Sequence, residues 1–314
     1  MKKAAVAATV ILAVISVFVG AGNLDLSGLS AGDPQHWLLL YETRLPRTIS
    51  LILAGGMLSV CGLVLQKIMQ NPFVSTNAIG MVDASRLGIL LVMLFLPNAS
   101  LALRSIVAFV FSYLGVLLFL VLSRLLPKGD VFILPLTGMM FGNVVGAIAS
   151  FFGYQFRLVQ NMSSWLQGNF ATVMKADHQL IYLTIPVFVL LFFLLHKIMV
   201  LSLGEELAQN FGLNVKRLQF LLLALVALGS TAVLIMVGSV PFLGIVVPNL
   251  VALKFGDHLK NTLFMTGVVG SGLLLLCDII ARLVIRPYEV PVSVVMGILG
   301  GLLFLVLLMR RRTA

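Results

Sequence analysis

Charged side chains are scarce in this sequence. Only 10% of its 314 residues are Asp, Glu, Lys or Arg, whereas 60% are hydrophobic. Soluble globular domains carry about 25% charged residues, so the composition excludes an ordinary soluble enzyme or binding module. Apolar runs of about 20 residues recur along the chain, and each is long enough to cross the hydrocarbon core of a bilayer. Because unpaired backbone groups are costly in lipid, we expect an all-α polytopic membrane protein.

Residues with metal or redox chemistry are also few. Cys61 and Cys277 both lie within apolar runs, and the four histidines are scattered near the ends of such runs. This spacing is not that of a metal site, so we expect buried free thiols, no resident metal or cofactor, and any iron to arrive already chelated. The net charge of +10 is ordinary for positively charged cytoplasmic loops and does not indicate nucleic-acid binding.

A nucleotide-binding motif is missing as well. The chain contains no Gly-x-x-x-x-Gly-Lys-[Ser/Thr] phosphate loop. If ATP with magnesium powers this protein, binding and hydrolysis must therefore belong to a separate subunit.

Ten spans are predicted, which form one membrane domain over residues 1–314. The first follows Lys2 and Lys3 like a signal peptide, but we interpret it as a span because no long soluble domain follows. The eighth is short and contains Pro241 and Pro248, so we expect it to be broken or tilted. A short interfacial helix anchored by Trp165 is expected over 161–169. The spans are expected at 4–21, 46–67, 81–97, 101–123, 131–153, 179–197, 217–237, 241–255, 261–284 and 290–309.

The distribution of basic residues predicts the orientation of these spans. An even number of spans puts both termini on one side, and Lys2, Lys3 and residues 310–312 mark that side as cytoplasmic. Arg44, Arg47 and Arg282 then lie at the outer face of a cytoplasmic (inner) membrane. Three matches at one constant offset suggest that the two halves are inverted repeats, namely Arg47, Pro72 and Phe73 with Lys216, Pro241 and Phe242.

The longest polar stretch, residues 202–217, lies between two apolar runs and cannot lie in lipid. Glu205 and Glu206 follow Gly204, which suits the first turn of a helix, and Gly212 is a stop signal. Leu207 and Phe211 are four residues apart and share one face. We therefore expect a short amphipathic docking helix in the cytoplasm; a solvated loop is the alternative.

Two further patterns concern the helices themselves. Asp278 and Arg282 are four residues apart and are expected to pair on one helix face, and Asp83 and Arg86 are interpreted similarly. Small side chains on the second span permit close approach of helices, so that face either packs within the subunit or lines a pathway. The residues of this second pattern are Gly55, Gly56, Ser59 and Gly62.

Several motifs follow one another in an order that resembles the FecCD family, the permease subunits of ABC importers for iron-siderophores, haem and cobalamin. They are Arg44–Arg47, Gln66–Phe73, Leu201–Glu206, Gly212–Arg217, Gly238–Asn249, Asp278–Arg282 and Glu289–Pro291. The resemblance covers nearly the whole chain. The segment Val74–Gly88 departs from the common pattern and looks like the branch for catecholate-type siderophores, which often pairs two different permease chains.

The resemblance implies an inverted-repeat permease fold with several partners: a second permease chain, the same or a paralogue, two cytoplasmic ATPase subunits, and an extracytoplasmic siderophore-binding protein. It implies that Arg44, Arg47 and Arg282 meet acidic residues on the binding protein, with snorkelling anchors as the alternative. It also implies that the loop at about 198–216 couples to the ATPase. Asn71 and Pro72 are candidates for the pathway or for helix packing.

The predicted function is therefore that of a ferric-siderophore permease without enzymatic activity of its own. Haem or cobalamin uptake is the alternative within the family. An ion-coupled secondary transporter would place acids deep in the bilayer, whereas the few here lie near the ends of spans. A membrane scaffold without transport activity is disfavoured by the ordered motifs.

Overall fold

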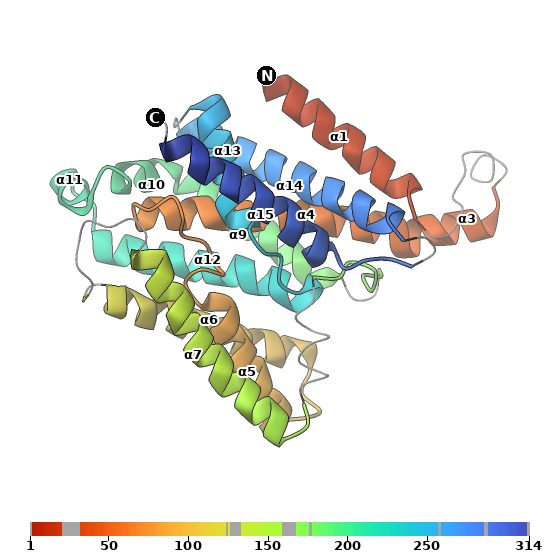
Figure 1. Cartoon of the computed structure of the whole chain (residues 1–314), viewed down its shortest axis with the longest axis horizontal. Coiled ribbons are helices and arrows are strands. Elements are labelled where there is room, and N and C mark those ends of the chain that lie inside the picture. The colour runs from red at the N-terminus through yellow and green to blue at the C-terminus, as the bar shows by residue number, and fades with distance from the viewer. Residues whose placement is uncertain are drawn as a thin grey trace.

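The computed structural model describes residues 2–20, 32–123, 125, 133–158, 168–175, 178–256, 259–285 and 288–312. The elements in these ranges are helices (Figure 1). The longer ones are α1 (Lys2–Phe18), α4 (Leu45–Ile68), α5 (Met81–Phe95), α6 (Leu101–Ser123), α7 (Ile133–Gln155), α12 (Val215–Val237), α13 (Leu243–Phe255), α14 (Leu259–Leu283) and α15 (Val292–Arg312). The shorter ones are α3 (Pro34–Leu39), η1 (Leu40–Arg44), η2 (Gln179–Leu183), α9 (Thr184–Phe193), α10 (Leu195–Leu201) and α11 (Glu205–Asn210).

Each of the ten predicted spans coincides with a helix or a run of consecutive helices. Within the described residues, six helices are long and apolar enough to cross a membrane, and a seventh span results if the bent run Gln179–Leu201 is counted as one. α1, α5 and α13 are shorter. This arrangement is compatible with about ten spans.

Three details differ from the sequence-based expectation. The eighth span is not broken, since α13 continues through Pro248. The sixth span is the bent one, with an angle of 60° between Gln179–Phe193 and Leu195–Leu201. The second span begins earlier, because α3, η1 and α4 run on as Pro34–Ile68. The predicted interfacial helix at 161–169 falls almost entirely outside the described residues.

α4 lies at the centre of the bundle (Figure 1). A β-carbon on its Gly55 would meet the backbone of Gly270 and Ser271 on α14, and one on Gly62 would meet Gly244 on α13. Gly56 faces Ser271, and Ser59 lies against Gly270. These small residues are therefore where α4 crosses its neighbours, as in other membrane helix pairs. Of the two interpretations left open by the sequence, helix packing is the one that these contacts support.

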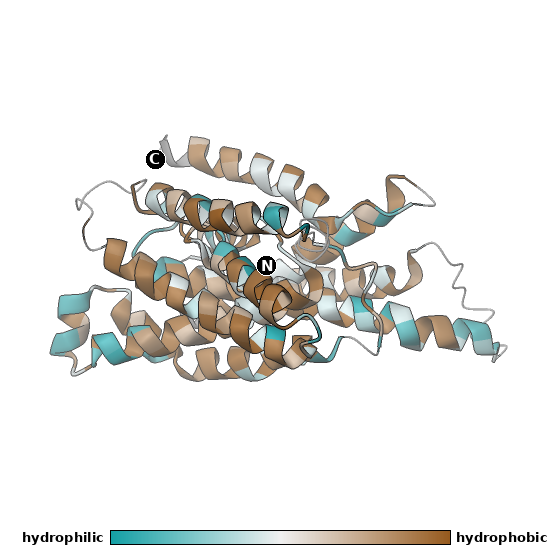
Figure 2. Ribbon diagram, turned by 90° about the horizontal axis from the view of Figure 1, so that it is seen from below, coloured by the Kyte–Doolittle hydropathy of each residue, from teal (hydrophilic) through white to brown (hydrophobic). Residues whose placement is uncertain are grey.

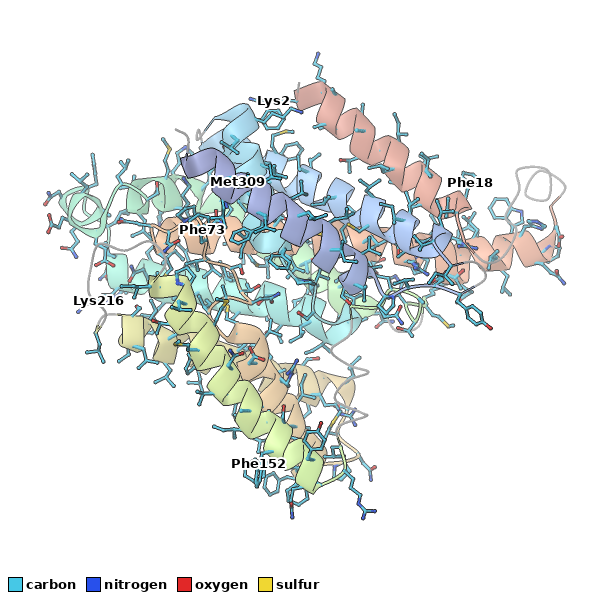
Figure 3. The ribbon with its side chains drawn as sticks, viewed as in Figure 1. Lys2, Phe18, Phe73, Phe152, Lys216 and Met309 are labelled. Carbon is cyan, nitrogen blue, oxygen red and sulfur yellow. The ribbon has the colours of Figure 1, made fainter. Side chains whose placement is uncertain are left out.

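The bundle has two polar ends, which we name after their elements. The α11 end carries α10 and α11, and the α3 end carries α3; Figure 2 shows hydrophilic residues gathered at both, with hydrophobic helices between them. Lys2 of α1 and Met309 of α15 lie at the ends of their helices that are nearer to α11, whereas Phe18 lies at the end of α1 that is nearer to α3 (Figure 3). The first and last helices therefore have their terminal residues on the same side as α11.

Two non-helical segments enter the interior of the bundle from opposite halves of the chain. Residues 71–80 precede α5 and residues 238–242 precede α13, and both helices start from a left-handed residue, Gly80 (φ 75°) and Phe242 (φ 62°). Asn77 donates to the carbonyl oxygen of Val240 (3.4 Å), and Asn249 donates to that of Pro72 (2.8 Å). The two helix–loop–helix units thus share one plan, which agrees with the predicted internal repeat.

Candidate functional site

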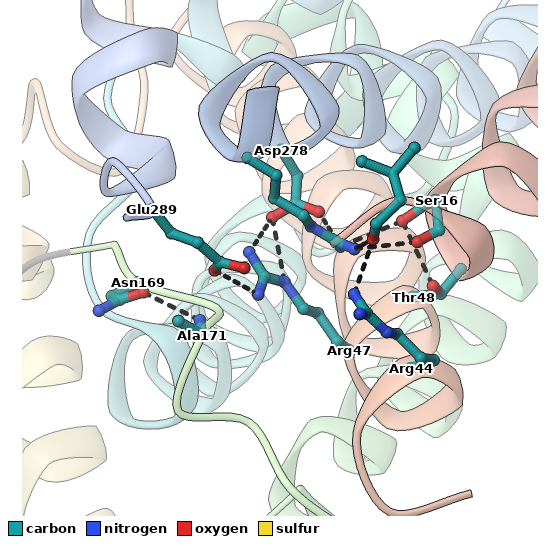
Figure 4. Close-up of polar contacts among 10 residues, drawn as sticks. Ser16, Arg44, Arg47, Thr48, Asn169, Ala171, Asp278 and Glu289 are labelled. Carbon is teal, nitrogen blue, oxygen red and sulfur yellow. Dashed lines mark hydrogen bonds and ion pairs between the residues drawn. The ribbon is translucent and has the colours of Figure 1, made fainter. Parts of the chain in front are cut away.

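A buried ionic network occupies the α3 end of the bundle (Figure 4). Arg47 Nη2 donates to Asp278 Oδ1 (2.7 Å), and Arg47 Nη1 donates to Glu289 Oε2 (2.6 Å). Asp278 also pairs with Arg282 one turn further along α14. The Asp278–Arg282 pair predicted from its spacing is confirmed. The role of Asp278 as a bridge between two arginines was not predicted, because Arg47 lies 231 residues away in sequence.

The same arginines bind the carboxyl end of α1. Arg44 Nη1 donates to the carbonyl oxygen of Val19 (2.7 Å), and Arg282 Nη1 donates to those of Val19 (2.6 Å) and Ser16 (2.9 Å). The last carbonyl groups of a helix lack partners within the helix and carry partial negative charge. Two guanidinium groups therefore satisfy these carbonyls and fix α1 against η1 and α14.

Burial decides what these three arginines can reach. Arg44, Arg47 and Arg282 are only 6%, 7% and 3% exposed. The structure brings the three predicted docking residues together. The hydrogen bonds described above, however, go to carboxylates and carbonyls of the same chain. Arg44 is the last residue of the π-helical turn η1, and it is the buried residue of that turn. The sequence contained no signal for this turn.

The short amphipathic helix predicted at the α11 end is confirmed as α11. Gly204 precedes it, Glu205 and Glu206 form its first turn, and Gly212 with φ 78° follows its end. Ala208 is fully buried, whereas Leu207 and Phe211 are 48% and 70% exposed. One face thus holds the helix on the bundle while an apolar face remains accessible, as expected of a docking element.

The two glutamates of α11 differ in their contacts. Glu205 Oε1 accepts a hydrogen bond of 2.7 Å from Gln219 Nε2 on α12. In the described part of the chain Glu206 has no such bond. The sequence spacing of 14 residues gave no reason to expect the Glu205–Gln219 contact.

A polar cavity of about 390 Å³ lies beside α11. Its wall combines the end of α4 with the turn before α11 and with α13. Asn71 and Pro72 therefore lie next to the predicted coupling loop. Side chains from these three parts are Gln66, Gln70, Asn71, Ser202 and Asn249.

A second cavity, of about 290 Å³, is apolar and lies among α1, α4, α9 and α14, with Gly56 in its wall. The hydroxyl groups of Thr9, Thr184 and Ser271 all donate to backbone carbonyls. The cavity is thus unsuited to a polar substrate. Among the described residues, no group of three His, Cys, Asp or Glu side chains could hold a metal ion.

Apolar helices that enclose buried polar segments, with an exposed amphipathic helix at one end, define a polytopic transport protein. The chain belongs to the FecCD transport family, whose pattern matches residues 8–310. It is thus the membrane permease component of an ABC importer, and ATP hydrolysis resides on a separate subunit.

Three similar proteins illustrate this membership. The petrobactin import permease YclN of Bacillus subtilis is 40% identical, with 96% of each chain covered. The ferric-anguibactin transport permease FatD of Vibrio anguillarum is 38% identical, with 95% of each chain covered. A metal-chelate type ABC transporter solved in an inward-facing conformation has a TM-score of 0.83 at 26% identity and covers 98% of each chain.

Proposed function

We propose that this permease moves a ferric siderophore of the catecholate type across the cytoplasmic membrane. The observation that carries the proposal is the identity of 40% and 38%, over nearly full length, to permeases named for petrobactin and ferric-anguibactin. Haem and cobalamin uptake, the alternative within the family, has less support from these relatives.

Each end of the bundle is proposed to bind a different partner. The α11 end faces the cytoplasm, as do both termini. One ATPase subunit docks on the exposed face of α11, with Leu207 and Phe211 at its centre, and a second ATPase subunit docks on the other permease chain. The α3 end faces outward and receives the siderophore-binding protein. A second permease chain, the same or a paralogue, completes the pathway.

The arginines at the α3 end are proposed to take part in docking of the binding protein. Because they are buried, an acidic group of the partner has to compete with a carboxylate of this chain. Glu289, whose side chain is 20% exposed, is more accessible than Asp278, which is fully buried. The bond between Arg47 and Glu289 is therefore the one that a partner can replace.

Transport with defined substrates tests the proposal. The permease, reconstituted with its ATPase and binding protein, is offered a ferric catecholate, haem, cobalamin and ionic iron. We expect ATP-dependent uptake of the ferric catecholate. Uptake of ionic iron with equal affinity, or of cobalamin in preference to the ferric chelate, would contradict it.

A further inference from the structure

The contact between α11 and α12 combines an exposed acid with a buried amide. Gln219 is 6% exposed, and its Nε2 donates to the Glu205 carboxylate over 2.7 Å. Hydrogen bonds to charged groups are stronger than neutral ones, and a buried amide left without its partner is costly. This bond is therefore a direct connection between the docking helix and a membrane span.

α12 is suited to carry a displacement across the membrane. It has 23 residues, and most of its side chains are buried from Val215 to Val237. At its other end the Val237 carbonyl accepts a hydrogen bond from Asn169 N (3.0 Å), and the neighbouring Gly168 carbonyl accepts one from Ser293 N on α15 (3.1 Å). A shift of α12 at the α11 end therefore reaches the beginning of α15 at the α3 end.

On the side away from α12, the turn before α11 borders a cavity instead of a membrane helix. Ser202 and Leu203, in the turn before α11, face Asn71 and Asn249 across the polar cavity of about 390 Å³. A cavity of this size and polarity has room for water. On this side the turn therefore borders a cavity that can hold water.

We infer that Gln219 is a positioning residue for transport, and that its bond to Glu205 makes α11 and α12 move as one body. The inference rests on the proposed docking of the ATPase at α11. Displacement of α11 by the ATPase is then passed directly to α12, and from α12 to α4, which packs against it.

Exchanging the two side chains tests this bond. Gln219→Glu places two carboxylates against each other, whereas the double variant Glu205→Gln with Gln219→Glu restores one donor and one acceptor with the same net charge as the wild type. Gln219→Leu removes the bond without adding charge. Gln155→Glu, at an exposed position at the end of α7, is the matched control for the added charge.

The full complex is assayed in proteoliposomes. The readout is the number of ferric catecholate molecules taken up per ATP hydrolysed, together with the affinity of the ATPase for the permease. We expect Gln219→Glu to lower this ratio on the order of tenfold at unchanged ATPase affinity, Gln219→Leu to lower it less, and the double variant to restore it. Gln155→Glu should match the wild type.

Three results would overturn the inference: a wild-type ratio in both single Gln219 variants, a double variant no better than Gln219→Glu, or an equal loss in Gln155→Glu. Failure of the proposed function itself looks different, because the ATPase would then not bind the wild-type α11 at all.

Discussion

At the scale of single residues, Asp278 is the most informative side chain. It is fully buried between Arg47 and Arg282. Its pairing with Arg282 could be predicted, since residues four apart share a helix face. Its pairing with Arg47, and the bonds of Arg44 and Arg282 to α1, depend on tertiary structure and leave no local pattern in the sequence.

Replacing Asp278 with Asn should destabilise the protein by about 3–5 kcal/mol, because buried Arg282 loses its carboxylate and Arg47 keeps only Glu289. Thermal unfolding in detergent measures this. Asp33→Asn is the matched control, since Asp33 is 41% exposed and its ion pair with His36 lies at the surface, where such pairs contribute about 0–1 kcal/mol. Equal stability of the two variants would show that the network is not structural.

Glu289→Gln tests the proposed competition for Arg47. If an acid of the binding protein takes the place of Glu289, removing this negative charge should strengthen docking, most clearly at low salt, because an interfacial charge pair at the rim is screened by ions. The measurement is the affinity of the binding protein for the permease complex in nanodiscs at two salt concentrations. Weaker docking at low salt would mean that Glu289 itself contacts the partner or holds the docking surface together.

At the scale of helices, the sequence predicted the ten spans well, because the length of an apolar run is set by the thickness of the bilayer. The sequence did not predict two irregularities that no residue marks. The bend near Leu194 has no proline or glycine at that position, and η1 has no known sequence signal. Pro248 had suggested a broken or tilted span, and the structure excludes the break. It lies in the middle of α13, and the Gly244 carbonyl, which Pro248 leaves without a backbone donor, accepts a hydrogen bond from Gln66 Nε2 (3.2 Å).

Helix crossings give a prediction at this scale. A methyl group on Gly62 would overlap the Gly244 backbone, so Gly62→Ala should lower stability by about 1–3 kcal/mol. At Gly297 of α15 the nearest heavy atom is 3.8 Å from the added carbon. Gly297→Ala should therefore be neutral or slightly stabilising, since alanine favours helix more than glycine does. Comparison of the two unfolding temperatures checks this, and an equal loss for both would contradict the packing role of Gly62.

At the scale of the whole molecule, the bundle has two polar ends, for which we propose opposite tasks on opposite sides of the membrane. α11, the start of α1 and the end of α15 lie toward one end of the bundle (Figures 1 and 3). The arginine network lies at the other, where it binds the carboxyl end of α1. The sequence could predict this division because polar residues and basic termini mark the ends of spans. It could not predict which residues connect the ends through α12, since that connection consists of contacts between distant segments.

Uptake into proteoliposomes tests the central claim most directly. The permease is reconstituted with a binding protein, with or without the separate ATPase, and uptake of a ferric siderophore is measured with ATP, without ATP, and with an imposed proton or sodium gradient. We predict uptake only when both the ATPase and ATP are present, and no uptake driven by a gradient alone. Uptake that a gradient drives without the ATPase would contradict this account and favour a secondary transporter.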